Sequence, residues 1–215
     1  MACRWLVYAA CLAAALALPT VAADDHPTQG FSPVRLNEGN FMLQWPYNVA
    51  RSSRYSRDGD VRKLWVFSTD KPFKPDSPTK PRTEMRMTGY DYSFGVWQFE
   101  GRVLVPAGTT GVSIMQVFGG SPTATTLMLH VYDGSLWYYH DQVVESNIYD
   151  RWLRINVIHD VDNSSLTVFI NGNRKLTVPG RGGTSHYFKF GVYEQKNPSN
   201  RMESHWKNVR ILQKN

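Results

Sequence analysis

Apolar and polar residues alternate with a period of two along most of this chain, as in β-strands buried on one side only. The stretch from 187 to 195 is the clearest case. Its apolar row holds Phe188, Phe190 and Val192, together with Glu194. Its polar row surrounds Gly191 and holds Tyr187, Lys189, Tyr193 and Gln195. Two phenols, an ammonium and an amide are unusual on a solvated edge, where charged residues prevail. The pattern favours a binding row, although simple packing of half-buried tyrosines would give it as well.

Two earlier segments carry comparable polar rows. The segment from 82 to 86 places its charged residues on one face, namely Arg82, Glu84 and Arg86. In the segment from 111 to 118, one face is expected to hold Ile114, Gln116 and Phe118, with Met115 and Val117 behind. If the three rows share one concave sheet face, they assemble guanidinium, ammonium, amide and phenol groups. Such a set suits a carboxylate on a molecule that also has hydroxyl groups.

Turn-forming residues recur between the other alternating segments. Asp133-Gly134 and Asn171-Gly172 are strong hairpin signals, and no helical period beyond about three turns follows residue 23. Residues 71–81 contain four prolines and predict an extended loop. Many short strands of this kind predict an all-β fold, a sandwich or jelly roll in a single domain. The further strands expected are 41–49 at an edge, 61–68, 95–105, 126–132, 135–140, 151–159, 166–170 and 206–212.

The first 23 residues have the pattern of a secretory signal peptide. Arg4 precedes an apolar run from 5 to 18, and small residues end at Ala23. We expect cleavage near Ala23, entry into the secretory pathway and a mature domain from 24 to 215. Both cysteines, Cys3 and Cys11, fall in this segment, so the mature domain has no disulfide and no cysteine nucleophile.

Composition narrows the classes of partner. The formal net charge is +6, of which the signal segment supplies one, and a mildly basic exported domain suits a polyuronate, a small polycarboxylate or a membrane surface. No basic stripe indicates nucleic acid, and no later stretch approaches the ~20 apolar residues of a membrane span. The histidines lack metal-binding spacings. We expect a monomer that has no cofactor, no metal, no nucleic-acid partner and no membrane partner.

Several single positions carry weaker signals. His130 alternates with its neighbours in the strand 126–132 and is a candidate for the face of Gln116, whereas the other histidines have no such pattern. Asn163 begins an Asn-Ser-Ser glycosylation sequon in a loop. The glycines of 180–183 lack the lysine of a phosphate loop, so a flexible rim beside the site is the better interpretation. Glu84 has no second acid for glycoside hydrolysis and is better suited to orient the flanking arginines.

Three segments resemble the signature strands of a known family. Arg-Thr-Glu-Met-Arg at 82–86, Gln-Val-Phe at 116–118 and Tyr-Phe-Lys-Phe-Gly-Val-Tyr-Glu-Gln at 187–195 are similar to those of alginate lyases, polysaccharide lyases with a β-jelly-roll fold. Nearly the whole mature chain further resembles the plant citrate-binding proteins, which share this lyase-like domain. The resemblance implies a jelly roll and an exported protein, found in the extracellular space or cell wall, or in a vacuole.

The resemblance also implies roles for single residues. The catalytic tyrosine of the lyases corresponds to Tyr193, and their carboxylate-neutralising residues correspond to Gln116 and to the strand of Arg82 and Arg86. Where the lyases have a histidine that helps catalysis, this chain has Phe118. β-Elimination on a uronate needs a neutralised carboxylate, a base for the C5 proton and an acid for the leaving oxygen. Tyr193 alone meets the last two needs only if proton and leaving group lie on one side of the ring.

The sequence leaves two principal functions open. The leading hypothesis is a binding protein for citrate or a uronan, with weak or absent catalysis. Its expected ligand-binding residues are Arg82, Glu84, Arg86, Gln116, Phe118, His130, Tyr187, Lys189, Tyr193 and Gln195. The alternative is a polysaccharide lyase that cleaves a uronate polymer by elimination, with Tyr193, Gln116, Arg86 and Arg82 as its catalytic residues. A third class, a structural wall-binding module, would use an aromatic platform of Phe118, Tyr187 and Tyr193.

Overall fold

The computed structural model describes residues 26–215, so the predicted signal peptide and both cysteines lie outside the described residues. Within that range the chain is built almost entirely from strands. The strands are β1 (Phe31–Pro33), β2 (Phe41–Gln44), β3 (Tyr55–Asp58), β4 (Val61–Phe67), β5 (Arg82–Met87), β6 (Val96–Leu104), β7 (Val112–Phe118), β8 (Thr125–Tyr132), β9 (Ser135–Tyr138), β10 (Gln142–Glu145), β11 (Leu153–Asp160), β12 (Ser165–Ile170), β13 (Asn173–Pro179), β14 (Tyr187–Glu194) and β15 (Arg201–Lys214). Two short 3-10 turns, η1 (Glu38–Asn40) and η2 (Arg51–Ser53), are the only helical elements of the described chain.

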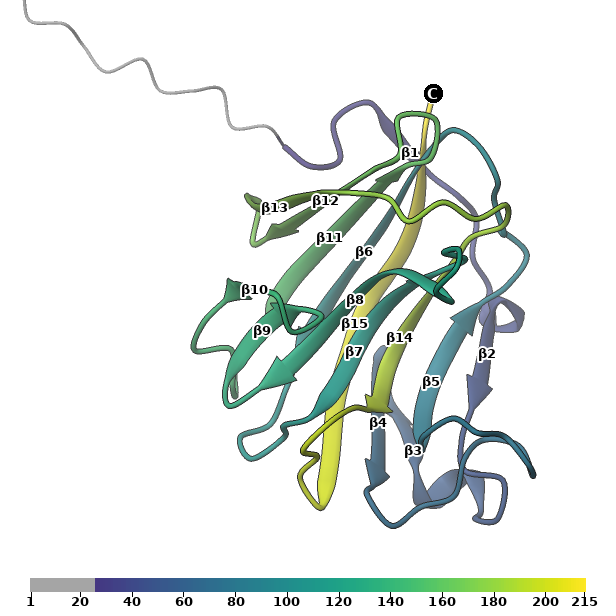
Figure 1. The fold of residues 1–215 in the computed structure, drawn as a ribbon, viewed down its shortest axis with the longest axis vertical. Helices are drawn as coiled ribbons and strands as arrows, with labels where there is room; N and C mark the ends of the chain where they lie inside the picture. Colours follow the sequence, from purple (N-terminus) through teal and green to yellow (C-terminus); the bar gives the residue numbers. More distant parts are fainter. Residues whose placement is uncertain (1–25) are drawn as a thin grey trace, which may run out of the picture.

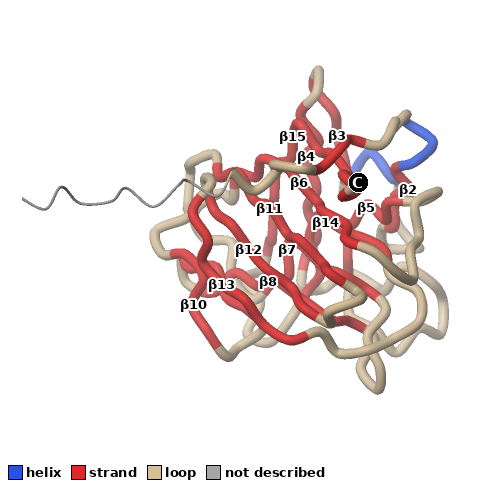
Figure 2. Tube along the Cα trace, turned by 90° about the horizontal axis from the view of Figure 1, so that it is seen from above, coloured by secondary structure: helices blue, strands red, loops and turns tan. Residues whose placement is uncertain are grey.

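The strands form two antiparallel sheets that face each other (Figure 1). One sheet has eight strands in the order β13-β12-β11-β6-β15-β4-β3, with β1 added along β15. The other has seven strands in the order β10-β9-β8-β7-β14-β5-β2. Figure 2 shows the helical turns at the margin near β2, away from the stacked strands. The predicted all-β sandwich is therefore confirmed, and β2 lies at a sheet edge, as expected for the segment 41–49, which contains Pro46.

Both sheets contribute aromatic rings to one hydrophobic core. Phe188 and Phe190 of β14 are at most 1% exposed, and the Phe99 ring of β6 lies 5.9 Å and 6.0 Å from their ring centroids. Trp206 of β15 packs 5.2 Å from Phe190. Burying one such side chain stabilises the fold by roughly 1.5–3 kcal/mol. Because residues 26–215 contain no cysteine, apolar packing and not a disulfide holds the two sheets together.

Two irregularities correct the predicted alternation. The pairing of β7 shifts between Ser113 and Met115, so Ile114 turns into the core instead of sharing the face of Gln116. That prediction was wrong because a β-bulge adds one residue to the strand and reverses the alternation beyond it. Gly191 sits at the matching shift in β14 with φ +138°, and a Cβ there would clash with the backbone oxygen of Thr83. The glycine therefore serves the close approach of β14 to β5 and does not clear space above the sheet.

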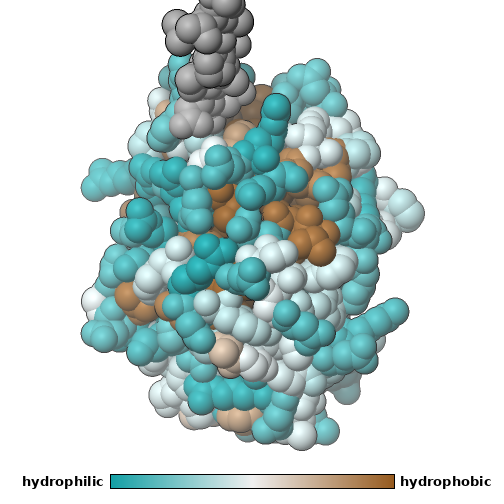
Figure 3. Space-filling view, turned by 90° about the vertical axis from the view of Figure 1, so that its left-hand side faces the viewer, coloured by the Kyte–Doolittle hydropathy of each residue, from teal (hydrophilic) through white to brown (hydrophobic). Residues whose placement is uncertain are grey.

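The margins of the sandwich hold four short strands that the sequence patterns did not predict, β1, β3, β10 and β13. Each is too short or too polar to show a clear alternation; β13, for example, has only Leu176 buried. Figure 3 views the side that carries β10 and β13, and polar residues cover most of it, with hydrophobic residues in small separate patches. Among residues 26–215, no helix has the length and apolar character needed to cross a membrane.

A pair of buried histidines occupies one end of the core. His159 of β11 and His186, just before β14, are 2% and 1% exposed, and their ring centroids lie 4.6 Å apart. Nδ1 of His159 lies 3.0 Å from the hydroxyl oxygen of Tyr92. Burial lowers the pKa of His159 to about 4, helped by the neighbouring His186, whose pKa burial also lowers. The His159 ring is therefore neutral in the folded protein at moderately acidic pH, and burial favours the neutral form of His186 as well.

These histidines predict a loss of stability on acidification. The unfolded chain takes up protons on both histidines as pH falls below ~6.5, whereas folded His159 does so only near pH 4. Between these values, protonation stabilises the unfolded state more than the folded state. We expect His159 to lower the free energy of unfolding by roughly 2 kcal/mol between about pH 6.5 and pH 5, with His186 acting in the same direction. Urea denaturation at both pH values measures it. His159→Gln, which keeps a partner for Tyr92, should flatten the dependence; an equally steep loss would contradict the assignment.

Candidate functional site

Most of the predicted site residues lie on the face of the seven-stranded sheet that points away from the core, which we call the site face. Cross-strand pairing places Tyr193 opposite Arg82 on one side and Ser113 on the other, with His130 beyond Ser113. A parallel row joins Arg86, Lys189 and Gln116, and Tyr187 is opposite Phe118. Directly opposed residues project to the same face. The three polar rows predicted from the sequence are thus brought together on one sheet.

Glu84 is the centre of this face. It is fully buried, and its two carboxylate oxygens receive three side chains from three strands. Lys189 Nζ lies 2.6 Å from Oε2, Arg82 Nη1 lies 3.4 Å from the same oxygen, and the Gln116 amide donates to Oε1. A buried carboxylate is tolerated only when its charge is paired and its oxygens are hydrogen-bonded. The arrangement agrees with the expected orienting role of Glu84, and it extends that role to the lysine and the amide.

Lys189 is committed to this internal ion pair. The residue is 3% exposed, and burial lowers its pKa while the Glu84 carboxylate acts in the opposite direction. Its charge is balanced within the sheet, so it adds less attraction for an incoming anion than its place in the sequence suggested. The other two cations of the site face are the guanidinium groups of Arg82, at 3.4 Å from the same carboxylate oxygen, and of Arg86, which pairs with Asp91.

Each of these two arginines lies flat on a tyrosine of β14. Cζ of Arg82 is 3.9 Å from the ring centroid of Tyr193, and Cζ of Arg86 is 4.0 Å from that of Tyr187. The geometry is that of a cation–π contact, which holds each guanidinium group over its ring. Arg86 also pairs with the exposed carboxylate of Asp91. We refer to the two contacts as the arginine–tyrosine platforms.

Phe118 stands beside one platform. Its ring is stacked on Tyr187 with centroids 4.8 Å apart and an interplanar angle of 16°. Burial raises the pKa of Tyr187, so its phenol stays protonated at neutral pH. A phenylalanine at this position offers a flat apolar surface and no proton. By contrast, the Tyr193 hydroxyl makes no hydrogen bond to any side chain or backbone group of residues 26–215, and the residue is partly exposed.

His130 reaches the site face at its far side, among aromatic residues that the sequence did not single out. The rings of Tyr132, Tyr139 and His140 lie 5.9, 5.8 and 5.4 Å from its ring. Burial, and secondarily His140, lowers the pKa of His130 to about 4. Neither ring nitrogen of His130 has a hydrogen-bond partner within the described range. The glycine-rich segment 180–183 borders this region as expected, since Cζ of Arg181 lies 4.0 Å from the ring centroid of Tyr139.

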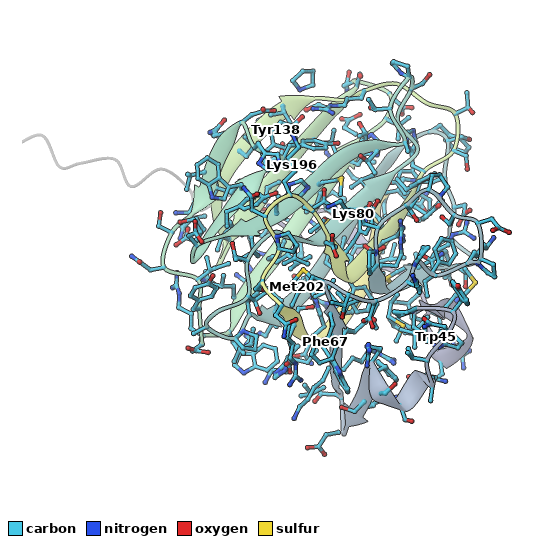
Figure 4. All side chains as sticks on the ribbon, turned by 60° about the horizontal axis from the view of Figure 1, so that its bottom comes forward. Trp45, Phe67, Lys80, Tyr138, Lys196 and Met202 are labelled. Carbon is cyan, nitrogen blue, oxygen red and sulfur yellow. The ribbon has the colours of Figure 1, made fainter. Side chains whose placement is uncertain are left out.

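The other side of the site face opens into a pocket of about 680 Å³, which we call the end pocket. Its aromatic lining comes from Trp45, Tyr47, Phe73 and Tyr187, and its cations are Lys74 and Arg86. Figure 4 shows Trp45 and Tyr138 far apart, as expected from β2 and β9 near opposite ends of the sheet. The sequence did not predict this pocket, because the aromatic lining residues that were not expected come from the segment after edge strand β2 and from the proline-rich loop 71–81. Neither segment shows a periodic pattern.

Two predicted positions lie outside the cluster. The Gln195 side chain turns onto its own backbone and donates to the carbonyl oxygens of Tyr193 and Glu194, so it does not extend the polar row of β14. Asn163 lies in an exposed turn between β11 and β12, remote in sequence and sheet from the site face. A hollow of about 640 Å³ beside β10 contains none of the predicted residues. No group of three or more potential metal ligands occurs within residues 26–215.

Comparisons with known proteins agree with this fold and site. Residues 34–213 match the model of the alginate lyase family. The chain is 51% identical over 207 residues to a citrate-binding protein of Hevea brasiliensis, a match that covers 94% of this chain and 87% of the relative.

Solved structures with the same architecture are alginate lyases. AlgAT5 of polysaccharide lyase family 7 superposes with a TM-score of 0.63 at 19% identity, covering 80% of this chain and 93% of its own. Alginate lyase A1-II′ gives 0.65 at 15% identity, covering 82% and 95%. The enzyme from Corynebacterium sp. gives 0.61 at 17% identity, covering 76% and 82%. These likenesses identify the sandwich as a jelly roll of the alginate lyase type.

The ion pair of Glu84 and Lys189 predicts strong energetic coupling. Lys189→Met leaves a buried carboxylate short of one cation, and Glu84→Gln leaves a buried ammonium without its anion, so each should cost about 3–5 kcal/mol of unfolding free energy. The double variant should recover part of that loss. Chemical denaturation of the four proteins measures the coupling. Arg57→Gln, which removes an exposed ion pair with Glu38, serves as the control and should cost about 0–1 kcal/mol. Additive losses in the double variant would contradict the pairing.

Proposed function

This chain belongs to the alginate lyase family, and on that premise we propose that it is a carboxylate-binding protein. It takes citrate, or the uronate units of a polysaccharide, on the site face of its seven-stranded sheet. Catalysis on this face is weak or absent. The homologue named as a citrate-binding protein, at 51% identity, supports this class of ligand. The alginate lyases, one of them an A1-II′ variant in complex with substrate, support an acidic sugar polymer as the alternative ligand.

The arginine–tyrosine platforms are the observation that carries this proposal. A guanidinium held flat on a ring presents two parallel N–H donors, which match the two oxygens of a carboxylate. Arg82 and Arg86 are four residues apart in β5, which corresponds to about 13 Å along an extended strand. A chain of uronate units reaches both platforms at once. A single citrate reaches both only if the two side chains turn towards each other.

On the same face, the position of the lyases' histidine holds no group for proton transfer. Phe118 occupies the position of the lyases' histidine, and the Gln116 amide is engaged with the buried Glu84. Binding needs neither an acid nor a base, so these features do not weaken it. The aromatic residues of the end pocket add flat surfaces for the apolar faces of sugar rings.

Export and processing complete the proposal. The protein is made with a signal peptide that is cleaved near Ala23. The mature monomer resides in the extracellular space or cell wall, or in a vacuole. Asn163 carries a glycan in this setting, and its exposed position in a turn leaves room for one.

Binding to the platforms predicts a specific loss of affinity. Arg86→Gln removes one bidentate contact and should weaken citrate or oligouronate binding by about tenfold or more, since a charge-assisted contact is worth ~1.5–3 kcal/mol. Isothermal titration calorimetry measures it. Arg35→Gln, an exposed arginine without an ion-pair partner in the described chain, removes the same charge elsewhere and should change little. Unchanged affinity in the Arg86 variant would defeat the proposal.

A lyase that uses tyrosine alone is the second candidate, because Tyr193 is partly exposed, its hydroxyl has no hydrogen-bond partner within residues 26–215, and its ring lies against Arg82. Elimination leaves an unsaturated uronate that absorbs in the near ultraviolet. If this candidate holds, incubation with a panel of uronans produces the absorbance, and Tyr193→Phe abolishes it while ligand affinity remains. Equal absorbance in both proteins would exclude the mechanism. Phe118→His then tests whether the histidine of the lyases restores turnover.

A further inference from the structure

Three cations lie side by side on the outer face of the eight-stranded sheet, opposite the site face. Arg102 of β6 is directly opposed by Arg154 of β11 on one side and by Lys207 of β15 on the other. Their inward neighbours Val103, Leu153 and Trp206 are buried in the core, so the three side chains point outward. We call this set the outer row.

The outer row is uncompensated. None of its three side chains has an acidic partner within ion-pair distance anywhere in residues 26–215. The neighbouring row of the same strands is arranged differently, because Glu100 there accepts from Asn156 and pairs with Arg210. Like charges directly opposed in a sheet are destabilising, so the outer row costs the fold stability that an acid at one position would restore. A feature of this kind points to an anion that arrives from outside.

A concave aromatic surface accompanies these charges. Arg102 and Arg154 line a hollow of about 280 Å³ together with Trp152 and Asn171. The ring of Trp152 also lies 4.2 Å from Nζ of Lys207, so the indole links the hollow to the third cation. The volume is at the small end of ligand sites and suits one sugar ring rather than a large cofactor. An indole beside paired guanidinium groups offers a stacking face and carboxylate donors in one place.

We propose that the outer row is a second binding site, which takes an acidic sugar unit of a polysaccharide. The carboxylate of the sugar is held by Arg102 and Arg154, Lys207 adds a point charge, and Trp152 contacts the ring. Strand spacing places the three cations about 5 Å apart, so a polyanion meets them in sequence. The site is independent of the platforms, since it lies on the other sheet. A protein with both sites engages acidic polymer on two opposite faces and bridges two chains of it.

The test is calorimetry with an oligogalacturonate of defined length on four proteins. These are the unmodified protein, the site-face variant Arg86→Gln, the outer-row variant Arg102→Gln/Arg154→Gln/Lys207→Gln, and a control of equal charge, Arg35→Gln/Arg174→Gln/Lys214→Gln, whose residues are all exposed. We expect two binding events in the unmodified protein and in the control. The outer-row variant should lose one event, and Arg86→Gln should keep it. The single change Arg102→Gln should not lower the melting temperature, because it removes a like-charge contact.

Several results would overturn this site. They are two unchanged events in the outer-row variant, an equal loss in the charge-matched control, or a fall in melting temperature with Arg102→Gln. Trp152→Ala keeps every charge and should weaken the second event by about tenfold, as expected for loss of one aromatic contact; no change would exclude a sugar. Tighter binding of single-stranded DNA than of oligogalacturonate to this row would also exclude it. If the unmodified protein shows only the event that depends on the outer row, and Arg86→Gln leaves it unchanged, the proposed function fails and the outer site stands.

Discussion

A fully buried carboxylate holds the middle of the site face together. Glu84 has no contact with solvent, so its charge can persist only because Lys189, Arg82 and Gln116 approach it from three strands. The need to neutralise Glu84 decides which cations form ion pairs inside the sheet and which can contact a ligand. Lys189 belongs to the first group. The two arginines lie over tyrosine rings and are engaged differently, since Arg82 lies 3.4 Å from Glu84 and Arg86 pairs with the exposed Asp91. The chemistry proposed for this protein depends on that difference.

The sequence predicted those parts of the structure that local periodicity controls. The alternation of Tyr187 to Tyr193 placed the tyrosines and Lys189 on one face and the phenylalanines in the core, as the structure confirms. The prediction failed for Ile114, because a bulge depends on how β7 and β8 pair and leaves no local signature. Trp45 and Phe73 could not be found either, since they come from an edge and from a loop that only the folded chain brings together.

The interactions within the site were harder to predict than the identity of the residues that form it. The residue types near Glu84 could be gathered from three segments, yet their partners could not be assigned without distances. A lysine beside two arginines was expected to attract a carboxylate from outside. The fold supplies that carboxylate itself, from the neighbouring strand. Likewise, the charges of the outer row are scattered over residues 102, 154 and 207, and only cross-strand pairing shows that they adjoin.

Phe118 lies beside the Glu84 network without taking part in it. Its ring contacts Tyr187, and no hydrogen bond links it to the buried acid or to the residues that surround that acid. The side chain at position 118 can therefore change without removing the ion pairs on which the sheet face depends. Under the proposed function, the residue that governs turnover is separate from the residues that hold the sheet together. In evolutionary terms, that separation lets a lineage with this fold lose or regain an enzymatic role while its thermodynamic stability is inherited intact.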